Sequence, residues 1–363
     1  MRRLLFAAMI VTTVGTTATG FLWPETTGLS AFQGGTAASQ PAAWRFEELA
    51  SGVYFATGTG VMTTMSNSLV IVNSDHVMLV DTSVTPIAAR ALVEQIRNEL
   101  TDKPIRYVFN SHHHFDHAHG NQIFGDEVEI VAHEYIRRMH LSNVLEQRTN
   151  RSFTINLPKQ VEDMRQQVAR ATEPAERARL QTALAITETH LKGVRETVVK
   201  PPNVTFTDVM TIHKGGREVQ LHFLGRGHTG GDTMVFLPAE RIVFTGDFFE
   251  GRPGAGILAY MGDGFIDEWP ASLERLKALE FDVIVPGHGA PFRERQQIVD
   301  FQNYLRDFWR QAAALRVQGV SAEDAAKRMD MTKYAAQYGE RVSTIDLRAV
   351  TRVYEQLQIQ MPM

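Results

Sequence analysis

A run of histidines is the most chemically suggestive feature of this sequence. Five histidines lie between positions 112 and 119, out of thirteen in the whole chain. They follow an apolar segment, Ile105–Phe109, that we expect to form a buried strand, and a loop at the carboxyl end of such a strand leaves side chains free to converge in a crevice. Neutral imidazoles and carboxylates suit zinc and similar divalent ions. The segment therefore predicts a metal site.

The spacing of the side chains in this segment selects among the candidate ligands. If the backbone is extended, alternation places His112, His114 and Asp116 on one side, with His113 and Phe115 facing away. The chain contains no cysteine, which excludes disulfides, thiolate ligands and cysteine nucleophiles. Any bound metal must therefore be held by His, Asp or Glu.

The segment His112-x-His114-x-Asp116-His117 resembles the HxHxDH signature of the metallo-β-lactamase superfamily. Four further segments resemble other motifs of that family and occur in the family's order. They are Leu79-Val80-Asp81-Thr82, Gly227-His228-Thr229-Gly230-Gly231-Asp232, Phe244-Thr245-Gly246-Asp247 and Pro286-Gly287-His288-Gly289. The matches extend from about Trp44 to Gly289 and omit a polar central stretch. Five segments in order are far more specific than one.

The resemblance implies a role for each of seven side chains. The first metal would be bound by His112, His114 and His228, the second by Asp116, His117 and His288, and Asp247 would bridge the two. The resemblance also implies a pair of zinc ions, with iron or manganese as alternatives. A metal-bridging hydroxide would then attack an ester, thioester or lactone carbonyl of a small-molecule substrate. Asp116 would orient this nucleophile and carry a proton to the leaving group.

Residues near these motifs lead to further hypotheses. Asp81 either orients a ligand histidine or stabilises a turn, and Thr229 and Asp232 are expected to shape the loop around His228. Other histidines near the motif, His113, His119 and His133, are expected to be structural or to support the ligands. The remaining candidates, which either line the substrate pocket or pack in the core, are Tyr260, Met261 and Trp269.

The order of the predicted elements indicates an α/β fold, and the resemblance implies that it is a four-layer αββα sandwich of the metallo-β-lactamase type. A ββα-like succession occurs twice along the chain. Thr85-Pro86 is typical of a helix start, and a second helix is predicted at Ala271–Leu279. The predicted strands are Gly52–Gly60, Asn67–Asn73, His76–Asp81, Ile105–Phe109, Glu127–Ala132, Val204–Ile212, Glu218–Gly225, Thr233–Leu237, Ile242–Thr245 and Val283–Val285.

The domain organisation follows from changes in composition. We expect the catalytic domain to span residues 44–295 and a helical extension to span 296–363. A polar, helix-prone insertion at about 143–200 is interrupted at Thr172-Glu173-Pro174, which predicts a helical hairpin. Such an insertion is either a surface embellishment or a lid over the site.

The first 43 residues are predicted to be a signal peptide and a flexible leader. Arg2 and Arg3 precede an apolar run from Leu4 to about Trp23. We expect export to the periplasm or the medium, or membrane anchoring if the segment is not cleaved. The net charge of −4, with both signs interspersed, gives no indication of nucleic-acid binding. The sequence leaves the oligomeric state open.

The residue at the bridging position narrows the choice of activity. True metallo-β-lactamases usually have Cys or Ser there, so Asp247 favours a branch resembling glyoxalase II and lactonases. Alkylsulfatases are disfavoured because they usually contain a further C-terminal domain. Three alternatives remain: a β-lactam hydrolase, an oxidoreductase resembling the mononuclear-iron persulfide dioxygenases, and a non-catalytic exported binding protein.

Overall fold

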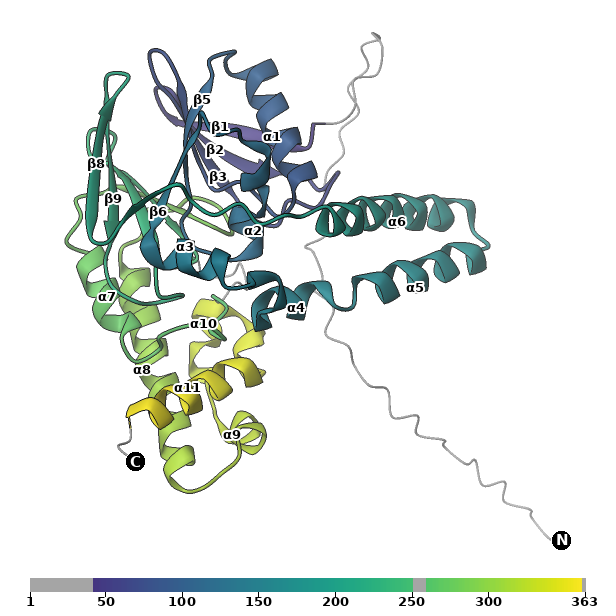
Figure 1. Ribbon diagram of the computed structural model, residues 1–363. Coiled ribbons are helices and arrows are strands. Elements are labelled where there is room, and N and C mark those ends of the chain that lie inside the picture. Colours follow the sequence, from purple (N-terminus) through teal and green to yellow (C-terminus); the bar gives the residue numbers. More distant parts are fainter. Residues whose placement is uncertain (1–41, 251–258, 361–363) are drawn as a thin grey trace, which may run out of the picture. The chain divides into compact units, whose positions relative to one another are not determined.

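The computed structural model describes residues 42–250 and 259–360 (Figure 1). The predicted signal peptide and most of the leader therefore lie outside the described residues. Within the two described ranges, no helix is both long and apolar enough to cross a membrane.

Two β-sheets form the centre of the fold, and they have seven and five strands. The larger sheet contains, in spatial order, β1 (Trp44–Ala50), β2 (Val53–Gly58), β3 (Ser68–Val72), β4 (Val77–Val80), β5 (Ile105–Phe109), β6 (Glu129–His133) and β7 (Val204–Phe206). The smaller sheet contains β12 (Val283–Pro286), β11 (Ile242–Gly246), β10 (Thr233–Leu237), β9 (Arg217–Phe223) and β8 (Val209–Lys214). Strands β1–β4 form an antiparallel meander, whereas β4–β7 run parallel to one another.

Alternation of side chains along the strands builds the layers of the core. Leu69 and Ile71 of β3 contact the facing sheet, whereas Val70 between them belongs to a cluster with Leu92 and Ile96 on the outer face. The cluster between the sheets combines side chains of β2–β7 with those of β9–β12. The two sheets therefore pack face to face.

Helices cover the outer face of each sheet (Figure 1). Helix α1 (Pro86–Glu99) covers the larger sheet, and Thr85 caps its first turn by accepting a hydrogen bond from the Ala88 amide, as predicted. Helices α7 (Trp269–Leu276), α8 (Gln296–Val317) and α11 (Leu347–Gln360) cover the smaller sheet. This arrangement confirms the four-layer αββα sandwich.

The remaining helices lie in the insertion, in the C-terminal region and beside the histidine loop. They are α2 (Phe115–Ala118), α3 (Glu134–Leu141), α4 (Arg148–Thr154), α5 (Leu157–Arg170), α6 (Pro174–Arg195), α9 (Ala322–Arg328) and α10 (Ala335–Tyr338). Short 3₁₀ turns are η1 (His119–Ile123), η2 (Val144–Glu146), η3 (Thr332–Tyr334) and η4 (Glu340–Ser343).

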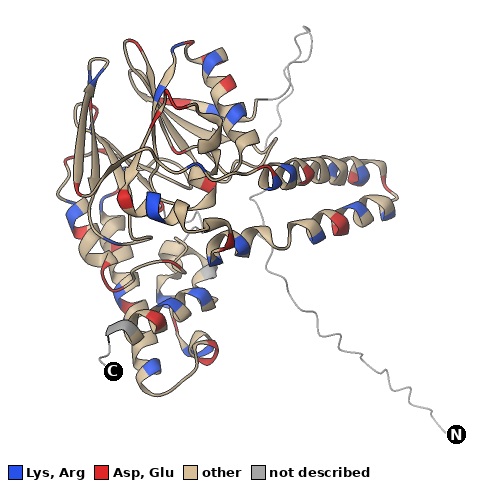
Figure 2. Ribbon diagram, in the orientation of Figure 1, with Lys and Arg blue, Asp and Glu red and all other residues tan. Residues whose placement is uncertain are grey.

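The predicted helical hairpin is present as α5 and α6. Helix α6 begins with Pro174 in its first turn, where the sequence indicated a restart. Leu157 and Val161 of α5 pack against Leu191 of α6. Charges of both signs alternate along the pair (Figure 2), and ion pairs such as Arg165–Glu188 link the two helices.

Two details of the sequence prediction were wrong. Val204–Ile212 is not one strand: β7 ends at Phe206 and β8 begins at Val209, and the two strands belong to different sheets. Both pieces have strand-forming residues, so pattern alone could not locate the crossing. Strand β1 was not predicted. The division into segments 1–43, 44–295 and 296–363 stays a prediction, and α8 and α11 share a core cluster with the smaller sheet.

Candidate metal centre

The loops that contain the predicted ligands meet at one edge of the two sheets. Asp81 directly follows β4, the histidine loop follows β5, Asp247 follows β11, and His288 lies two residues beyond β12. The carboxyl ends of parallel strands open toward the same edge of a sheet, where loops can converge. Strand order therefore brings together side chains that are far apart in sequence.

All seven predicted ligands belong to two adjoining groups of side chains. In each group, ligand atoms lie within 4.8 Å of one another, and Asp247 belongs to both. The first group is His112, His114, His228 and Asp247, and the second is Asp116, His117, His288 and Asp247. These are the sets that the family resemblance implied.

The carboxylate of Asp247 lies between the imidazoles of the two groups. Its Oδ2 atom is 3.7 Å from Nε2 of His112 and 3.6 Å from Nε2 of His228. The same oxygen is 3.4 Å from Nε2 of His288, and Oδ1 is 3.2 Å from Nε2 of His117. Asp247 thus contacts both groups, as a bridging ligand must.

The conformation of the histidine loop differs from the extended segment that we expected. The residues up to His114 lie before helix α2. Asp116 and His117 lie within the single turn of this helix. A helical turn places these two side chains toward the second group. Strand-like alternation therefore gave the wrong reason for including Asp116. His113 is nevertheless absent from both groups, as predicted.

Hydrogen bonds fix the orientation of several of the imidazoles. Nδ1 of His117 lies 2.7 Å from Oδ2 of Asp81, and both side chains are fully buried. Asp81 also accepts hydrogen bonds from the backbone amide and the hydroxyl of Ser111, and that hydroxyl lies 3.0 Å from Nδ1 of His112. Nδ1 of His288 lies 3.1 Å from the carbonyl oxygen of Met65. Such partners fix the tautomer and direction of a ligand histidine.

Asp263 is a partner that the sequence analysis missed. Its Oδ2 atom lies 3.2 Å from Nε2 of His114, while Nδ1 of His114 lies 3.0 Å from Nε2 of His228 in the first group. Asp263 belongs to no motif and lies 149 residues from His114 in sequence. Nothing in the sequence distinguished it from other loop aspartates.

The loop around His228 is shaped by Thr229 and Asp232, as predicted. The Thr229 amide donates to both carboxylate oxygens of Asp232, and its hydroxyl donates to Oδ1 across 2.7 Å. Burial raises the pKa of Asp232 to about 6, although the Thr229 hydrogen bonds lower it. This closed turn presents the His228 imidazole to the first group.

Gly287 has to be glycine because of its contacts. A Cβ at this position would collide with Oδ1 of Asp247 and with the His117 ring. Asn67 fixes the same turn by donating to the carbonyl oxygens of Pro286 and Gly289. The turn can therefore hold His288 against the Asp247 carboxylate.

The three candidate pocket residues have different environments. Trp269 and Met261 are buried in the core cluster beneath the smaller sheet. Tyr260 is only partly buried, and its ring lies 6.0 Å from the His114 ring and 6.5 Å from the His228 ring. Of the three, only Tyr260 remains a candidate for the pocket wall.

Burial and charge divide the ligand histidines into two kinds. Burial lowers the pKa of His228 to about 3 and keeps the pKa of His112 well below 6.5. Burial also lowers the pKa of His117 and His288, but nearby carboxylates, that of Asp247 foremost, outweigh it and hold both values well above 6.5. Burial and the charge of Asp247 together raise the pKa of Glu250.

The unpaired polar atoms of the site test whether it fits a metal. Nε2 of His112, Nε2 of His117 and Oδ1 of Asp247 are buried and make no hydrogen bond within the described residues. Unpaired buried nitrogens and oxygens are rare because desolvation is costly. Here they face one another as nitrogen and oxygen donors, and neutral imidazoles and carboxylates are donors that divalent metals prefer. The residues therefore fit metal binding.

Three other buried histidines near the site belong to neither group. Burial lowers the pKa of His119 to about 3 and that of His140 to about 4. Nε2 of His140 lies 3.3 Å from the carbonyl oxygen of His113 and so supports the loop from behind. His133 accepts a hydrogen bond from the Tyr135 amide and caps α3.

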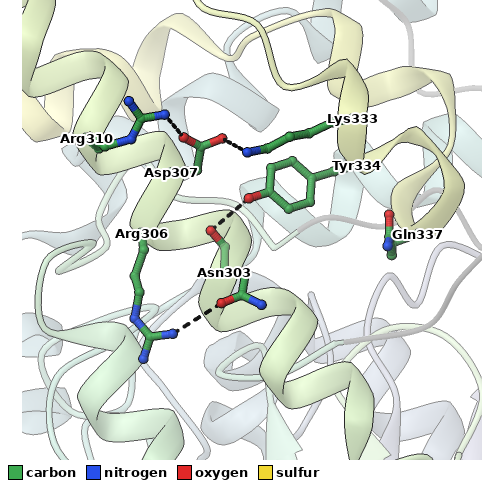
Figure 3. Close-up of a pocket in the computed structure, with 7 residues that line it drawn as sticks. All are labelled: Asn303, Arg306, Asp307, Arg310, Lys333, Tyr334 and Gln337. Carbon is green, nitrogen blue, oxygen red and sulfur yellow. Dashed lines mark hydrogen bonds and ion pairs between the residues drawn. The ribbon is translucent and has the colours of Figure 1, made fainter.

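A hollow in the C-terminal helices contains charged side chains but none of the predicted ligands (Figure 3). The buried carboxylate of Asp307 pairs there with Arg310 and, across 2.9 Å, with Lys333. The Tyr334 hydroxyl donates to the carbonyl oxygen of Asn303. These contacts join η3 to α8, which is a structural role.

Comparisons with known proteins agree with this arrangement. A sequence profile of the metallo-beta-lactamase superfamily matches residues 61–288. A linear primary-alkylsulfatase from Pseudomonas is 25% identical over 73% of this chain, which spans 50% of that protein. A metallo-beta-lactamase type 2 from Bacteroides fragilis is 24% identical over 62% of this chain and 69% of its own. The solved structure of a metallo-beta-lactamase from Pontibacter korlensis has a similar fold, with a TM-score of 0.53 and 19% identity over 72% of this chain and 99% of its own.

Proposed function

This chain belongs to the metallo-β-lactamase superfamily and is an enzyme of it, and on that premise we propose that it hydrolyses an ester, thioester or lactone with the help of two zinc ions. The superfamily accounts for the metal-binding His/Asp cluster. The number of ions, their identity and the substrate class are our proposals.

The position of Asp247 is the observation on which the proposal depends. A carboxylate has two oxygens, and those of Asp247 face imidazoles of both groups at 3.2–3.7 Å. One carboxylate can therefore serve two ions. The donors are nitrogens and oxygens only, which suits zinc, with iron and manganese as alternatives.

Bound divalent ions would supply the chemistry that side chains alone lack, since they lower the pKa of water and polarise a carbonyl oxygen. The protein supplies position and proton transfer. Asp116 is buried and Oδ2 lies 3.1 Å from Nε2 of His288. Burial raises its pKa, but His117 and His288 outweigh that effect and keep the carboxylate ionised. Asp116 is thus placed to hold the proton of an attacking water and to return it to the leaving group.

The residue at the bridging position favours carbonyl esters and lactones over β-lactams. The bridging position is Asp247, where β-lactamases of the family usually have Cys or Ser. An aspartate bridge is typical of the branches resembling glyoxalase II and lactonases. A β-lactam hydrolase remains an alternative in the assay below.

Sulfate esters are a second candidate substrate class. The alkylsulfatase relative is 25% identical over most of this chain, although the chain spans only half of that protein. Its name describes the hydrolysis of an alkyl sulfate ester. Both candidates involve cleavage of an ester bond beside a pair of cations.

We further propose that the protein is exported to the periplasm or the medium, or anchored if its N-terminal segment is retained, and that its partner is a small-molecule substrate. Arg2, Arg3 and the apolar run that follows them support export. The balanced charge argues against nucleic acid as a partner.

A substrate panel on zinc-loaded protein tests the proposal. The panel contains a carboxylic ester, a thioester, a lactone, an alkyl sulfate and a cephalosporin, and the matched control is Asp247→Ala. We expect turnover of a carbonyl ester or lactone that chelation abolishes and zinc restores. If the protein binds two ions but hydrolyses none of these substrates, the result would favour the alternative of a non-catalytic binding protein. One iron per chain with oxygen consumption would identify a dioxygenase instead.

A further inference from the structure

The histidine loop is contacted on its outer side by segments of the chain that contain none of the five family motifs. The loop at residues 259–268 leads into α7 and presents Asp263 to His114. The Asp263 side chain is 27% exposed and that of His114 is 4% exposed, so the contact closes the outer side of the first group.

The insertion holds Asp263 from one side. Thr149, which is buried in α4, donates its hydroxyl to Oδ2 of Asp263, the same oxygen that contacts His114. The neighbouring Arg148 donates to the carbonyl oxygen of Gly262. The insertion is therefore in direct contact with the residue that orients a predicted ligand.

The C-terminal helix α11 holds the same loop from another side. Arg348, Arg352 and Gln356 are spaced four residues apart, so they lie on one face of α11. The Arg348 guanidinium lies 4.7 Å from the centre of the Tyr260 ring, and Nε of Arg352 donates to the carbonyl oxygen of Gly264 across 2.7 Å. Gln356 accepts a hydrogen bond from the Ile266 amide.

The insertion and α11 also contact each other. Nη2 of Arg148 lies 2.5 Å from Oε1 of Glu355, so a salt bridge joins α4 to α11 next to the loop. Both partners are only about a third exposed, at 38% and 36%. The two outer elements therefore form one support rather than two separate embellishments.

We infer that Asp263 is a positioning residue of the metal centre, held against His114 jointly by the helical insertion and the C-terminal helix. The inference depends on the metal binding of the proposed function. His114 directs Nδ1 toward the first group. If Nδ1 binds the metal, the proton must be on Nε2, which then donates a hydrogen bond to Asp263. A carboxylate in this position fixes the tautomer and raises the basicity of the ligand. The outer helices thereby control the affinity of the first metal position.

A separate cation site is the alternative to this positioning role. His113, His114 and Asp263 lie close enough together to bind a cation of their own. However, Oδ2 of Asp263 already accepts hydrogen bonds from Thr149 and His114. A third ion would also require both nitrogens of His114 to bind metal. The positioning role needs neither change.

Metal affinity, measured by chelator competition on Co²⁺-loaded protein, tests the inference without reference to turnover. In Asp263→Ala we expect one of two ions to bind about 10- to 100-fold more weakly, with an altered cobalt absorption spectrum, and the other ion to bind as in the wild type. Asp263→Asn keeps an acceptor oxygen and should recover part of the loss. This recovery also keeps the test valid if the alanine variant fails to fold.

The contribution of the insertion is tested in α4 by a matched pair of substitutions. Thr149→Val removes the hydroxyl that donates to Asp263 and should weaken the same ion by a few-fold. Thr154→Val removes a hydroxyl of the same helix that donates only to the carbonyl oxygen of Asn150, and it should change nothing.

Each possible failure has a distinct meaning. If the wild type and Asp263→Ala both bind two ions with equal affinity, the positioning role of Asp263 is wrong. The proposed function is not affected by that result. A third ion that is lost in both His113→Ala and Asp263→Ala would also overturn it. A folded wild type that binds no metal would overturn the proposed function as well.

Discussion

The carboxylate of Asp81 lies 2.7 Å from Nδ1 of His117, and neither side chain is exposed to solvent. Burial raises the pKa of Asp81, and the charge of His117 acts against that effect. The same carboxylate accepts two hydrogen bonds from Ser111. One buried aspartate thus orients a predicted ligand and also fixes the start of the loop that contains the others.

Removing the Asp81 carboxylate should weaken one metal position. We expect Asp81→Ala to lower the affinity for one ion by about 10- to 100-fold, because His117 loses the partner that fixes its tautomer. Chelator competition measures this change. Asp75→Ala is the control, since Asp75 makes an equally short contact with His76 but is exposed. Unchanged affinity in a folded Asp81 variant would contradict the role.

Asp247→Ala should have a larger effect, because both groups lose a shared donor. We expect loss of the second ion and a fall in turnover of more than roughly 100-fold. That factor is the upper limit for residues that only support a metal ligand. Elemental analysis and the ester assay measure these effects, and circular dichroism confirms folding. Glu280→Ala, at an exposed site, is the control. Unaltered turnover would refute the bridge.

His113→Ala should retain nearly all of the metal. His113 is buried, but it belongs to neither group around Asp247, and its ring packs 5.8 Å from that of Tyr135. We expect two ions per chain and a modest loss of stability from the cavity. Metal content by elemental analysis and thermal unfolding measure these two outcomes. Loss of an ion would show that His113 is a ligand.

Metal binding should release protons from the second group. The pKa of His117 and of His288 is held well above 6.5, so both imidazoles are protonated at pH 7 in the metal-free protein. An ion can bind only after these protons leave, so its affinity should fall as the pH is lowered. His112 and His228 have lowered pKa values and are neutral at pH 7. The first group should therefore release fewer protons.

Calorimetry in buffers of different ionisation enthalpy measures this release. His288→Ala removes one protonated imidazole and should also lose the second ion, so that His117 keeps its proton. The number of released protons should therefore fall by about two. Equal release by the variant and the wild type would contradict the assigned charge states.

The predictable parts of the site were those encoded in short segments. The spacing of His112, His114, Asp116 and His117 is local, and the strand that precedes them could be predicted from its apolar run. Resemblance then supplied the distant ligands His228, Asp247 and His288. Their convergence depends on the order of strands in two sheets, which no local pattern specifies.

The parts that could not be predicted depend on contacts between distant segments. Asp263 and His114 are 149 residues apart, and Asp263 lies in a loop with no motif. The supporting side chains of α11 are spaced like any solvent-facing stripe of a helix. The crossing between β7 and β8 was missed because each strand has the same propensity in either sheet.

The number of ions that each chain binds tests the central claim most directly. Native mass spectrometry of metal-free protein titrated with zinc should show saturation at two ions per chain for the wild type and at one for His288→Ala. Saturation of the folded wild type at one ion, or at none, would contradict a two-metal site built by seven side chains, with Asp247 shared between the two groups.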